Sequence, residues 1–338
     1  MGFPQVDLVP GYSVSQFIKG GWQNAGCPAP MLDNLLDFVR AGVTTFETAD
    51  SYPGGEELMG VLRSAAREQL PRELSRRIKI HTRFTAPIRG PGPTVRDVTK
   101  RVERSLSRIG IERLDLVQLQ WWNLDVPSLV DAGMVLADLQ QQGKIGLIGV
   151  CNLGSGSLST LLDAGVPVAT NQVHFSLIDR RAENKIATFC HARGIGLMTF
   201  APLAGGFLSG VWQSVSDPVG TQTLFSREFR ALIDVDGGWK KFQHLLTVLD
   251  TIATRHDMSI AQVAQSWVKQ CGPGQAILFG ASTTEQLSET RAVLDTRLTE
   301  VDLAEIEAVC TVRSPLDIGE IERAPGSSMM QAIKEHVG

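Results

Sequence analysis

Residues 94–119 read TVRDVTKRVERSLSRIGIERLDLVQL and contain one complete step from helix to strand. The first part repeats apolar residues at the spacing of one helix face, and these are Val95, Val98, Val102 and Leu106. Thr94 and Asp97 fit the capping-box pattern that marks the start of a helix. Residues 114–119 are too short and too evenly apolar for another helix, so we interpret them as a buried parallel strand.

The same alternation of helix-period stretches and short apolar runs continues through most of the chain. Helical spacing recurs at 32–39 and 260–268, and capping-box patterns recur at Ser259 with Gln262 and at Thr283 with Gln286. Eight strands are predicted, at residues 16–19, 43–46, 78–82, 114–119, 145–150, 166–173, 195–200 and 276–279. Eight strands separated by helices predict an α/β protein, a single-domain (β/α)8 TIM barrel. A doubly wound sheet is the alternative, but no predicted strand is followed by G-x-G-x-x-G.

The barrel is predicted to occupy residues 14–313, between an N-terminal segment (1–13) and a C-terminal extension (314–338). Residues 208–238 are polar and contain glycines, so we expect a long loop there. Such a loop would overhang the C-terminal end of the barrel, where the chemistry of this fold is located.

The composition excludes several classes of protein. The 338 residues carry 32 Lys and Arg against 36 Asp and Glu, a net charge of −4, which argues against nucleic acid as a partner. No apolar run approaches the ~18 residues of a membrane span, so we expect no membrane association and a cytoplasmic location. The five cysteines and six histidines are scattered without metal-binding spacing, so no metal site is predicted.

Polar side chains gather where the predicted strands end. Residues 46–57 read FETADSYPGGEE and hold several carboxylates together with Tyr52, one of only two tyrosines. The next strands end in Arg83 and Gln120. Because the carboxyl ends of barrel strands meet at one opening, we expect these side chains to share a cavity, whereas Asp50 and Glu56 are expected to be solvated.

Several of these blocks, taken in order, resemble the aldo/keto reductases. They are IKGGWQ (18–23), residues 42–57, RLDLVQL (113–119), residues 143–152, NQV (171–173) and APLAGGFL (201–208). The resemblance covers residues 14 to about 294. It implies a barrel that reduces an aldehyde or ketone with NADPH, using a Tyr proton donor assisted by Asp, Lys and His.

The resemblance places the catalytic set on Tyr52, Glu47, Arg83 and Gln120, so three of its four residue types have changed. A phenol, with an ordinary pKa of about 10, donates its proton well near neutrality only where a cation stabilises the phenolate. Arg83 can supply that charge, although a guanidinium cannot relay a proton as Lys can. Glu47 can pair with Arg83, and Gln120 can donate a hydrogen bond but cannot titrate.

The resemblance also implies a nicotinamide cofactor, NADP or NAD. The nicotinamide side falls on Asn152, Gln172 and Phe200, with Cys151 where the family has Ser or Thr. The loop facing the pyrophosphate falls on Leu203, Gly205 and Gly206, whose glycines permit close approach of the backbone.

The adenosine side of that cofactor falls on Gly280 and Thr283. The family places a basic residue there for the 2′-phosphate, but residues 280–290 contain no Lys or Arg, and Thr290 replaces the Asn that meets the adenine. Because an arginine–phosphate bond contributes about 1.5–3 kcal/mol, the sequence does not predict a preference for NADPH.

Trp22, Trp121, Trp122 and His174 are expected to line the pocket of a small-molecule substrate. Three functions are compatible with these features. The first is a variant NAD(P)(H)-dependent carbonyl oxidoreductase. The second is a barrel that performs non-redox acid/base chemistry, such as dehydration, isomerisation or cyclisation. The third is a non-catalytic relative that binds a nucleotide or a protein. The substrate and the oligomeric state have no sequence signature.

Overall fold

The fold is a closed barrel of parallel strands, described in a computed structural model for residues 2–22, 31–87, 89–124, 127–218, 224–310 and 317–318. Neighbouring barrel strands follow chain order, and β10 closes the ring by pairing with β3 and β9. The eight strands are β3 (Phe17–Lys19), β4 (Thr45–Glu47), β5 (Lys79–Thr85), β6 (Leu114–Gln120), β7 (Ile145–Cys151), β8 (Val168–His174), β9 (Gly196–Phe200) and β10 (Ala276–Phe279). The predicted (β/α)8 barrel is confirmed, and each predicted strand overlaps an observed one.

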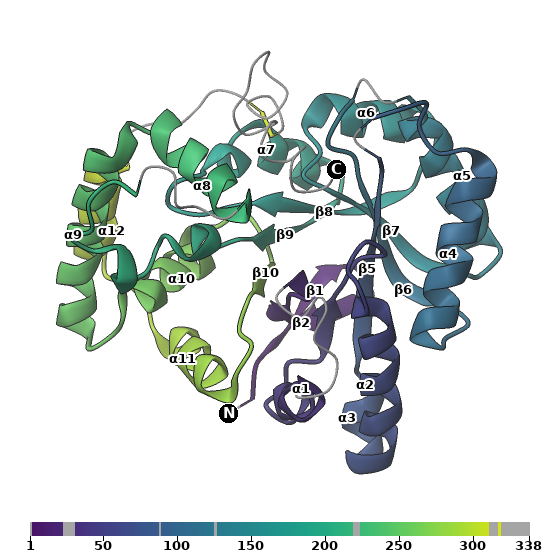
Figure 1. Cartoon of the computed structure of the whole chain (residues 1–338), viewed down its shortest axis with the longest axis horizontal. Helices are drawn as coiled ribbons and strands as arrows, with labels where there is room; N and C mark the ends of the chain where they lie inside the picture. The colour runs from purple at the N-terminus through teal and green to yellow at the C-terminus, as the bar shows by residue number, and fades with distance from the viewer. Residues whose placement is uncertain are drawn as a thin grey trace.

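Helices surround these strands (Figure 1). They are α1 (Met31–Arg40), α2 (Gly55–Gln69), α3 (Arg72–Arg76), α4 (Val95–Ile109), α5 (Leu129–Gln141), α6 (Ser155–Asp163), α7 (Lys185–Ala192), α8 (Leu224–Val235), α9 (Gly238–His256), α10 (Ile260–Cys271), α11 (Thr284–Asp295) and α12 (Glu300–Val309). Short 3-10 turns lie at η2 (Arg181–Glu183), η3 (Ala204–Gly206) and η4 (Gly210–Trp212). The apolar faces of the helices and the outward side chains of the strands form the main hydrophobic core.

An antiparallel hairpin, β1 (Gln5–Val9) with β2 (Tyr12–Ser15), precedes the barrel and covers its base. Leu8 and Val14 pack against inward-facing barrel residues, and Lys79, the first residue of β5, donates to the backbone of the hairpin. The hydroxyl of Tyr12 lies 3.1 Å from Nε2 of His81 inside the barrel. The sequence reading did not foresee this hairpin, which closes the end of the barrel opposite the predicted site. The division of the chain at residues 13 and 14 stays a prediction.

The segment 208–238, predicted as a loop, contains helix α8 and turn η4. Phe229, Leu232 and Ile233 follow helical spacing and are buried, which explains why this part of the segment is helical. Residues 219–223 lie outside the described residues. So does the predicted C-terminal extension apart from residues 317 and 318, where the Asp317 carboxylate accepts a 2.8 Å hydrogen bond from the Ser155 backbone.

Two of the three predicted capping boxes are complete. Thr94 with Asp97 begins α4, and Ser259 with Gln262 begins α10, each with both reciprocal bonds. At α11 the Thr283 hydroxyl accepts from the Gln286 backbone, but the Gln286 side chain accepts from Ser282 rather than from Thr283. The helix start is therefore as predicted, with the second bond shifted by one residue.

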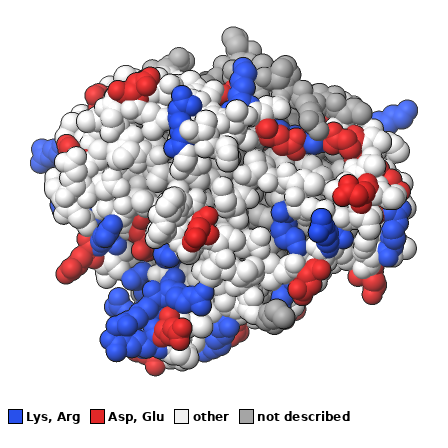
Figure 2. Space-filling model, turned by 180° about the vertical axis from the view of Figure 1, so that it is seen from behind, with Lys and Arg blue, Asp and Glu red and all other residues white. Residues whose placement is uncertain are grey.

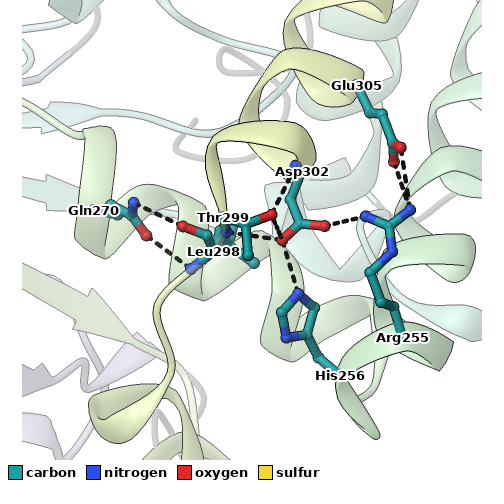
Figure 3. A network of polar contacts seen from close by, with 7 residues as sticks. All are labelled: Arg255, His256, Gln270, Leu298, Thr299, Asp302 and Glu305. Atoms are coloured by element: carbon teal, nitrogen blue, oxygen red, sulfur yellow. Dashed lines mark hydrogen bonds and ion pairs between the residues drawn. The ribbon is translucent and has the colours of Figure 1, made fainter.

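A buried carboxylate ties α9 to α12 (Figure 3). Asp302 accepts from the Thr299 backbone (2.8 Å) and hydroxyl (2.7 Å), lies 2.8 Å from Nε2 of His256, and pairs with Arg255. Burial alone would raise the pKa of Asp302, but these hydrogen bonds lower it to about 2. The charged carboxylate is therefore the form that the fold stabilises.

We expect Asp302→Ala to lower the free energy of unfolding by about 2–4 kcal/mol at neutral pH, because it removes a helix cap and charged hydrogen bonds. Since the folded-state pKa of Asp302 lies below its unfolded value, its contribution is present above about pH 4 and is lost as the pH falls towards 2. Chemical denaturation across this range should show the two proteins converging in acid. Glu305→Ala, which removes an exposed partner of the same Arg255, is the control and should change little. A constant difference at every pH would contradict the assignment.

Lys and Arg gather on one lobe at the lower left of the rear face (Figure 2), where α2 and α3 lie. Residues 63–79 contain six basic and two acidic side chains, in a chain whose net charge is −4. Because α3 leads directly into the N-terminal end of β5, this lobe lies at the opposite end of that strand from the mouth of the barrel. None of the helices in the described ranges is long and apolar enough to cross a membrane.

Candidate active site

The turn between β4 and α2 carries Tyr52 into the mouth of the barrel. The Tyr52 backbone N–H donates to Ala49 (3.0 Å), and its carbonyl accepts from Gly55 (3.0 Å). A Cβ atom at position 55 would lie 2.7 Å from the Thr48 hydroxyl and 3.0 Å from Cβ of Tyr52, so only glycine lets the turn close this tightly. The Tyr52 side chain is 8% exposed, and its ring meets Trp22 edge-on with centroids 5.3 Å apart.

The guanidinium of Arg83 contacts the other three residues of the predicted catalytic set. Nη2 of Arg83 donates to the Tyr52 hydroxyl, and Nη1 donates to Oε1 of Gln120 (3.3 Å). Nε of Arg83 lies 2.8 Å from Oε1 of Glu47, which makes an ion pair. All four side chains are buried, and they come from β5, β6, the end of β4 and the turn that follows β4. The structure therefore places the phenol and the cation in direct contact.

Lys19, which the sequence reading did not single out, is a second buried cation near Glu47. Its ammonium donates to the Gly20 carbonyl, and the Gly21 backbone donates to Oε2 of Glu47 (3.2 Å). Burial lowers the pKa of Lys19 to about 8, against the opposing attraction of Glu47. The available signal was a lysine at the end of the first predicted barrel strand, because a charged side chain buried there needs a partner.

Cys151 ends β7 beside the same guanidinium, with its sulfur 3.9 Å from Nη1 of Arg83. Burial raises the pKa of this thiol to about 11, although Arg83 opposes the shift. The thiol is therefore protonated near neutrality and does not cancel the charge of Arg83.

The residues predicted to hold the nicotinamide lie at the ends of β7, β8 and β9. Asn152 has a left-handed backbone (φ 53°), and its Oδ1 accepts from the His174 backbone (3.1 Å). Its Nδ2 is buried without a hydrogen-bond partner within the described ranges. Gln172 accepts a 2.8 Å bond from Gln118. An unsatisfied buried donor costs about 1–3 kcal/mol. A ligand with a carbonyl oxygen, such as a carboxamide, would remove this cost by accepting a hydrogen bond from Nδ2 of Asn152.

The loop after Phe200 presents its backbone rather than side chains. Ala201, Ala204, Gly205 and Gly206 all have positive φ, with values of 59°, 48°, 66° and 96°. The Leu203 carbonyl accepts from Gly206 (2.9 Å) and from Leu208 (3.1 Å), which closes the turn. The Ala204 backbone likewise donates to the Ala201 carbonyl (2.9 Å), so much of the backbone of this loop bonds to itself. Gly205 is exposed and Gly206 is partly exposed, so a ligand could approach their backbone, and the pyrophosphate contact of Leu203, Gly205 and Gly206 stays a prediction.

The residues predicted to meet the adenosine half of the cofactor have structural roles in the fold. Gly280 is exposed between β10 and α11, and Thr283 caps α11. The Thr290 hydroxyl is turned back onto its own helix, where it donates to the Gln286 carbonyl (2.9 Å). Glu285 lies in the first turn of α11. Residues 280–290 contain two carboxylates, Glu285 and Glu289, and no Lys or Arg.

The four predicted pocket residues have different surroundings. Trp121 is 1% exposed and belongs to the main core, whereas Trp122 and Trp22 are partly exposed. His174 is buried, its ring 4.0 Å from that of Phe200 and 5.7 Å from that of Phe229 on α8. Of the three tryptophans predicted to line the pocket, Trp22 and Trp122 therefore have exposed surface and Trp121 does not.

The side chains of Asp50 and Glu56, expected to be solvated, are instead buried. Asp50 pairs with Arg101, and Glu56 pairs with Arg108 at 3.2 Å. Both arginines belong to α4. The expectation was wrong because the sequence does not show that Arg101 and Arg108 of α4 lie against the segment that carries Asp50 and Glu56.

This fold and site define a barrel protein that brings a buried phenol, a cation and a glycine-containing loop to one opening. A sequence model of the aldo/keto reductase family matches residues 18–310, and the chain belongs to this family.

Named relatives agree with this assignment. A probable aldo-keto reductase from Glycine max is 30% identical over 79% of this chain and 76% of its own length. An NADH-specific methylglyoxal reductase from Escherichia coli K12 is 24% identical over 86% of this chain and 93% of its own length. Among solved structures, a glycerol dehydrogenase from Gluconobacter oxydans has a TM-score of 0.75 at 21% identity, covering 94% of this chain and 98% of that one. At this identity the last comparison shows the shared fold alone.

Proposed function

We propose that this oxidoreductase of the aldo/keto reductase family interconverts a carbonyl group and an alcohol on a small molecule, using NADH or NADPH. The observation that supports the proposal is the contact of Tyr52 and Arg83 at the C-terminal end of the barrel, with Glu47 and Gln120 on the same guanidinium. A bound nicotinamide would supply or accept the hydride.

In the reducing direction, the Tyr52 hydroxyl donates its proton to the carbonyl oxygen as the carbonyl carbon gains hydride. The products are an alcohol and a phenolate, and Arg83 stabilises the phenolate through direct contact. Glu47 orients Arg83 from the opposite side. Because Oε1 of Gln120 faces Arg83 and the Thr85 hydroxyl, its Nε2 is the atom that can donate to the substrate oxygen.

Asn152 and Gln172 would hold the nicotinamide, and the loop containing Gly205 and Gly206 would meet the pyrophosphate. The proposal is tested by titrating the protein with each reduced nucleotide, following Trp fluorescence, and then adding aldehydes and ketones. Binding followed by substrate-dependent oxidation of the nucleotide supports the proposal. Failure to bind either nucleotide would refute it.

We further propose that NADH is preferred over NADPH. No cation lies among residues 280–290, and Glu285 stands at the helix start where a 2′-phosphate would approach. Because a 2′-phosphate there would meet a carboxylate and no cation, NADH should bind more tightly than NADPH. Glu285→Arg should reduce the difference in affinity between NADH and NADPH. Glu289→Arg makes the same charge change one turn further along α11 and should leave that difference unchanged. Equal affinities in the unmodified protein would refute the preference.

A further inference from the structure

Helix α4 reaches the turn that carries Tyr52 through two arginines. Arg101 and Arg108 are seven residues apart, so they project from the same helix face. Nε of Arg101 donates to Oδ2 of Asp50 (2.5 Å), and Nη1 of Arg108 donates to Oε2 of Glu56 (3.2 Å). Asp50 precedes Tyr52 by two residues and Glu56 follows it by four, so the two contacts hold the turn on both sides of the phenol.

The same two carboxylates also bind the strand that carries Arg83. Oδ1 of Asp50 accepts from the Thr85 backbone (3.3 Å), and Arg101 donates to the Thr85 carbonyl (2.8 Å). Oε1 of Glu56 accepts from the Thr82 hydroxyl (2.8 Å). Thr82 and Thr85 flank Arg83 on β5. Each ion pair is therefore bonded to both halves of the catalytic contact, namely the Tyr52 turn and the Arg83 strand.

We propose that the ion pairs Arg101–Asp50 and Arg108–Glu56 are positioning devices that fix the Tyr52 hydroxyl against the Arg83 guanidinium. The inference rests on the function proposed for Tyr52. None of the four residues touches the reacting atoms, so they act through Tyr52 and Arg83.

The energetics of burial support a positioning role. The carboxylates of Asp50 and Glu56 are 2% and 1% exposed. Burial raises the pKa of Asp50 even though Arg101 opposes the shift, so the environment disfavours the charge on Asp50. Buried ion pairs often add little net stability, but their fixed hydrogen-bond directions constrain geometry. A displacement of about 1 Å at a reacting group can cost about a hundredfold in rate.

The two tyrosines allow a direct test of geometry. Protein labelled with 3-fluorotyrosine should give two fluorine NMR resonances, for Tyr12 at the base of the barrel and Tyr52 at the mouth, assigned with Tyr52→Phe. Arg101→Met should shift or broaden the Tyr52 resonance and leave Tyr12 unchanged. Arg96→Met is the matched control, because Arg96 is exposed on the same helix and makes no side-chain hydrogen bond or ion pair in the described part of the chain. If Arg101→Met does not fold, Asp50→Asn keeps the side-chain shape and provides the same test.

A double-mutant cycle separates positioning from general stability. Arg101→Met should lower kcat by about tenfold to a hundredfold with little change in the KM for the nucleotide. In the Tyr52→Phe background the same substitution should cause no further loss, because the group it positions is gone. An equal loss in both backgrounds, or an unchanged Tyr52 resonance, would overturn the inference. If Tyr52→Phe itself leaves kcat unchanged, the proposed role of Tyr52 fails, while the NMR result still decides whether the ion pairs fix its position.

Discussion

Tyr52→Phe is expected to lower kcat/KM for carbonyl reduction by about 10²- to 10⁴-fold, the range typical of removing a positioned general acid. Phenylalanine keeps the ring that meets Trp22 edge-on at 5.3 Å, so the turn should retain its shape. The affinity for NADH should stay within about twofold, because the residues assigned to the cofactor are elsewhere. Steady-state kinetics and a fluorescence titration of the same variant provide both measurements.

Three outcomes would change the functional conclusion. Full activity in Tyr52→Phe would mean that another group donates the proton. Conversion of a carbonyl substrate without net oxidation of NADH would favour non-redox acid/base chemistry. Nucleotide binding without turnover of any carbonyl compound would favour a binding role.

Arg83→Met is expected to reduce both activity and stability. It breaks the ion pair of the Glu47 carboxylate, which is 3% exposed, and breaking a buried pair in this way typically costs about 3–5 kcal/mol. Carbonyl reduction should fall as well, because the phenolate loses its contact with the guanidinium. Urea denaturation and steady-state kinetics measure the two effects separately.

Two further variants distinguish these effects. Arg83→Met combined with Glu47→Gln removes the carboxylate that Arg83 paired with, but it also takes a nearby anion from the buried Lys19 ammonium. Only part of the lost stability should therefore return, while activity stays low. Arg83→Lys restores a cation, but one ammonium cannot reproduce the planar fork that spans Tyr52, Glu47 and Gln120. Its activity should therefore lie between those of Arg83→Met and the unmodified protein. A double variant as unstable as Arg83→Met would show that Glu47 is not the source of the instability.

The barrel could be predicted because its strands carry strong local signals. Residues 114–119 and 145–150 are short apolar runs between helical stretches, and β6 (Leu114–Gln120) and β7 (Ile145–Cys151) extend them by one residue. Strand ends then define the mouth, which is why Tyr52, Arg83 and Gln120 could be placed together before any coordinates.

Features that depend on contacts between distant elements were not predictable in this way. The burial of Asp50 and Glu56 depends on α4 lying against the Tyr52 turn, some fifty residues away in sequence. The hairpin β1–β2 was missed because its strands are short and half-polar, and it is stabilised by packing on the barrel base. The helical part of 208–238 was hidden by the polar residues on the exposed side of α8.

The guanidinium of Arg83 affects how the catalytic rate should depend on pH above neutrality. Arginine keeps its charge at every pH at which proteins are folded, and the attraction of Glu47 strengthens that tendency against the effect of burial. A lysine in the same place would begin to lose its charge near its own titration range. Arg83 should consequently contribute no proton loss to the basic limb of the rate profile, whereas Lys19 beside Glu47, whose pKa burial lowers to about 8, can contribute one.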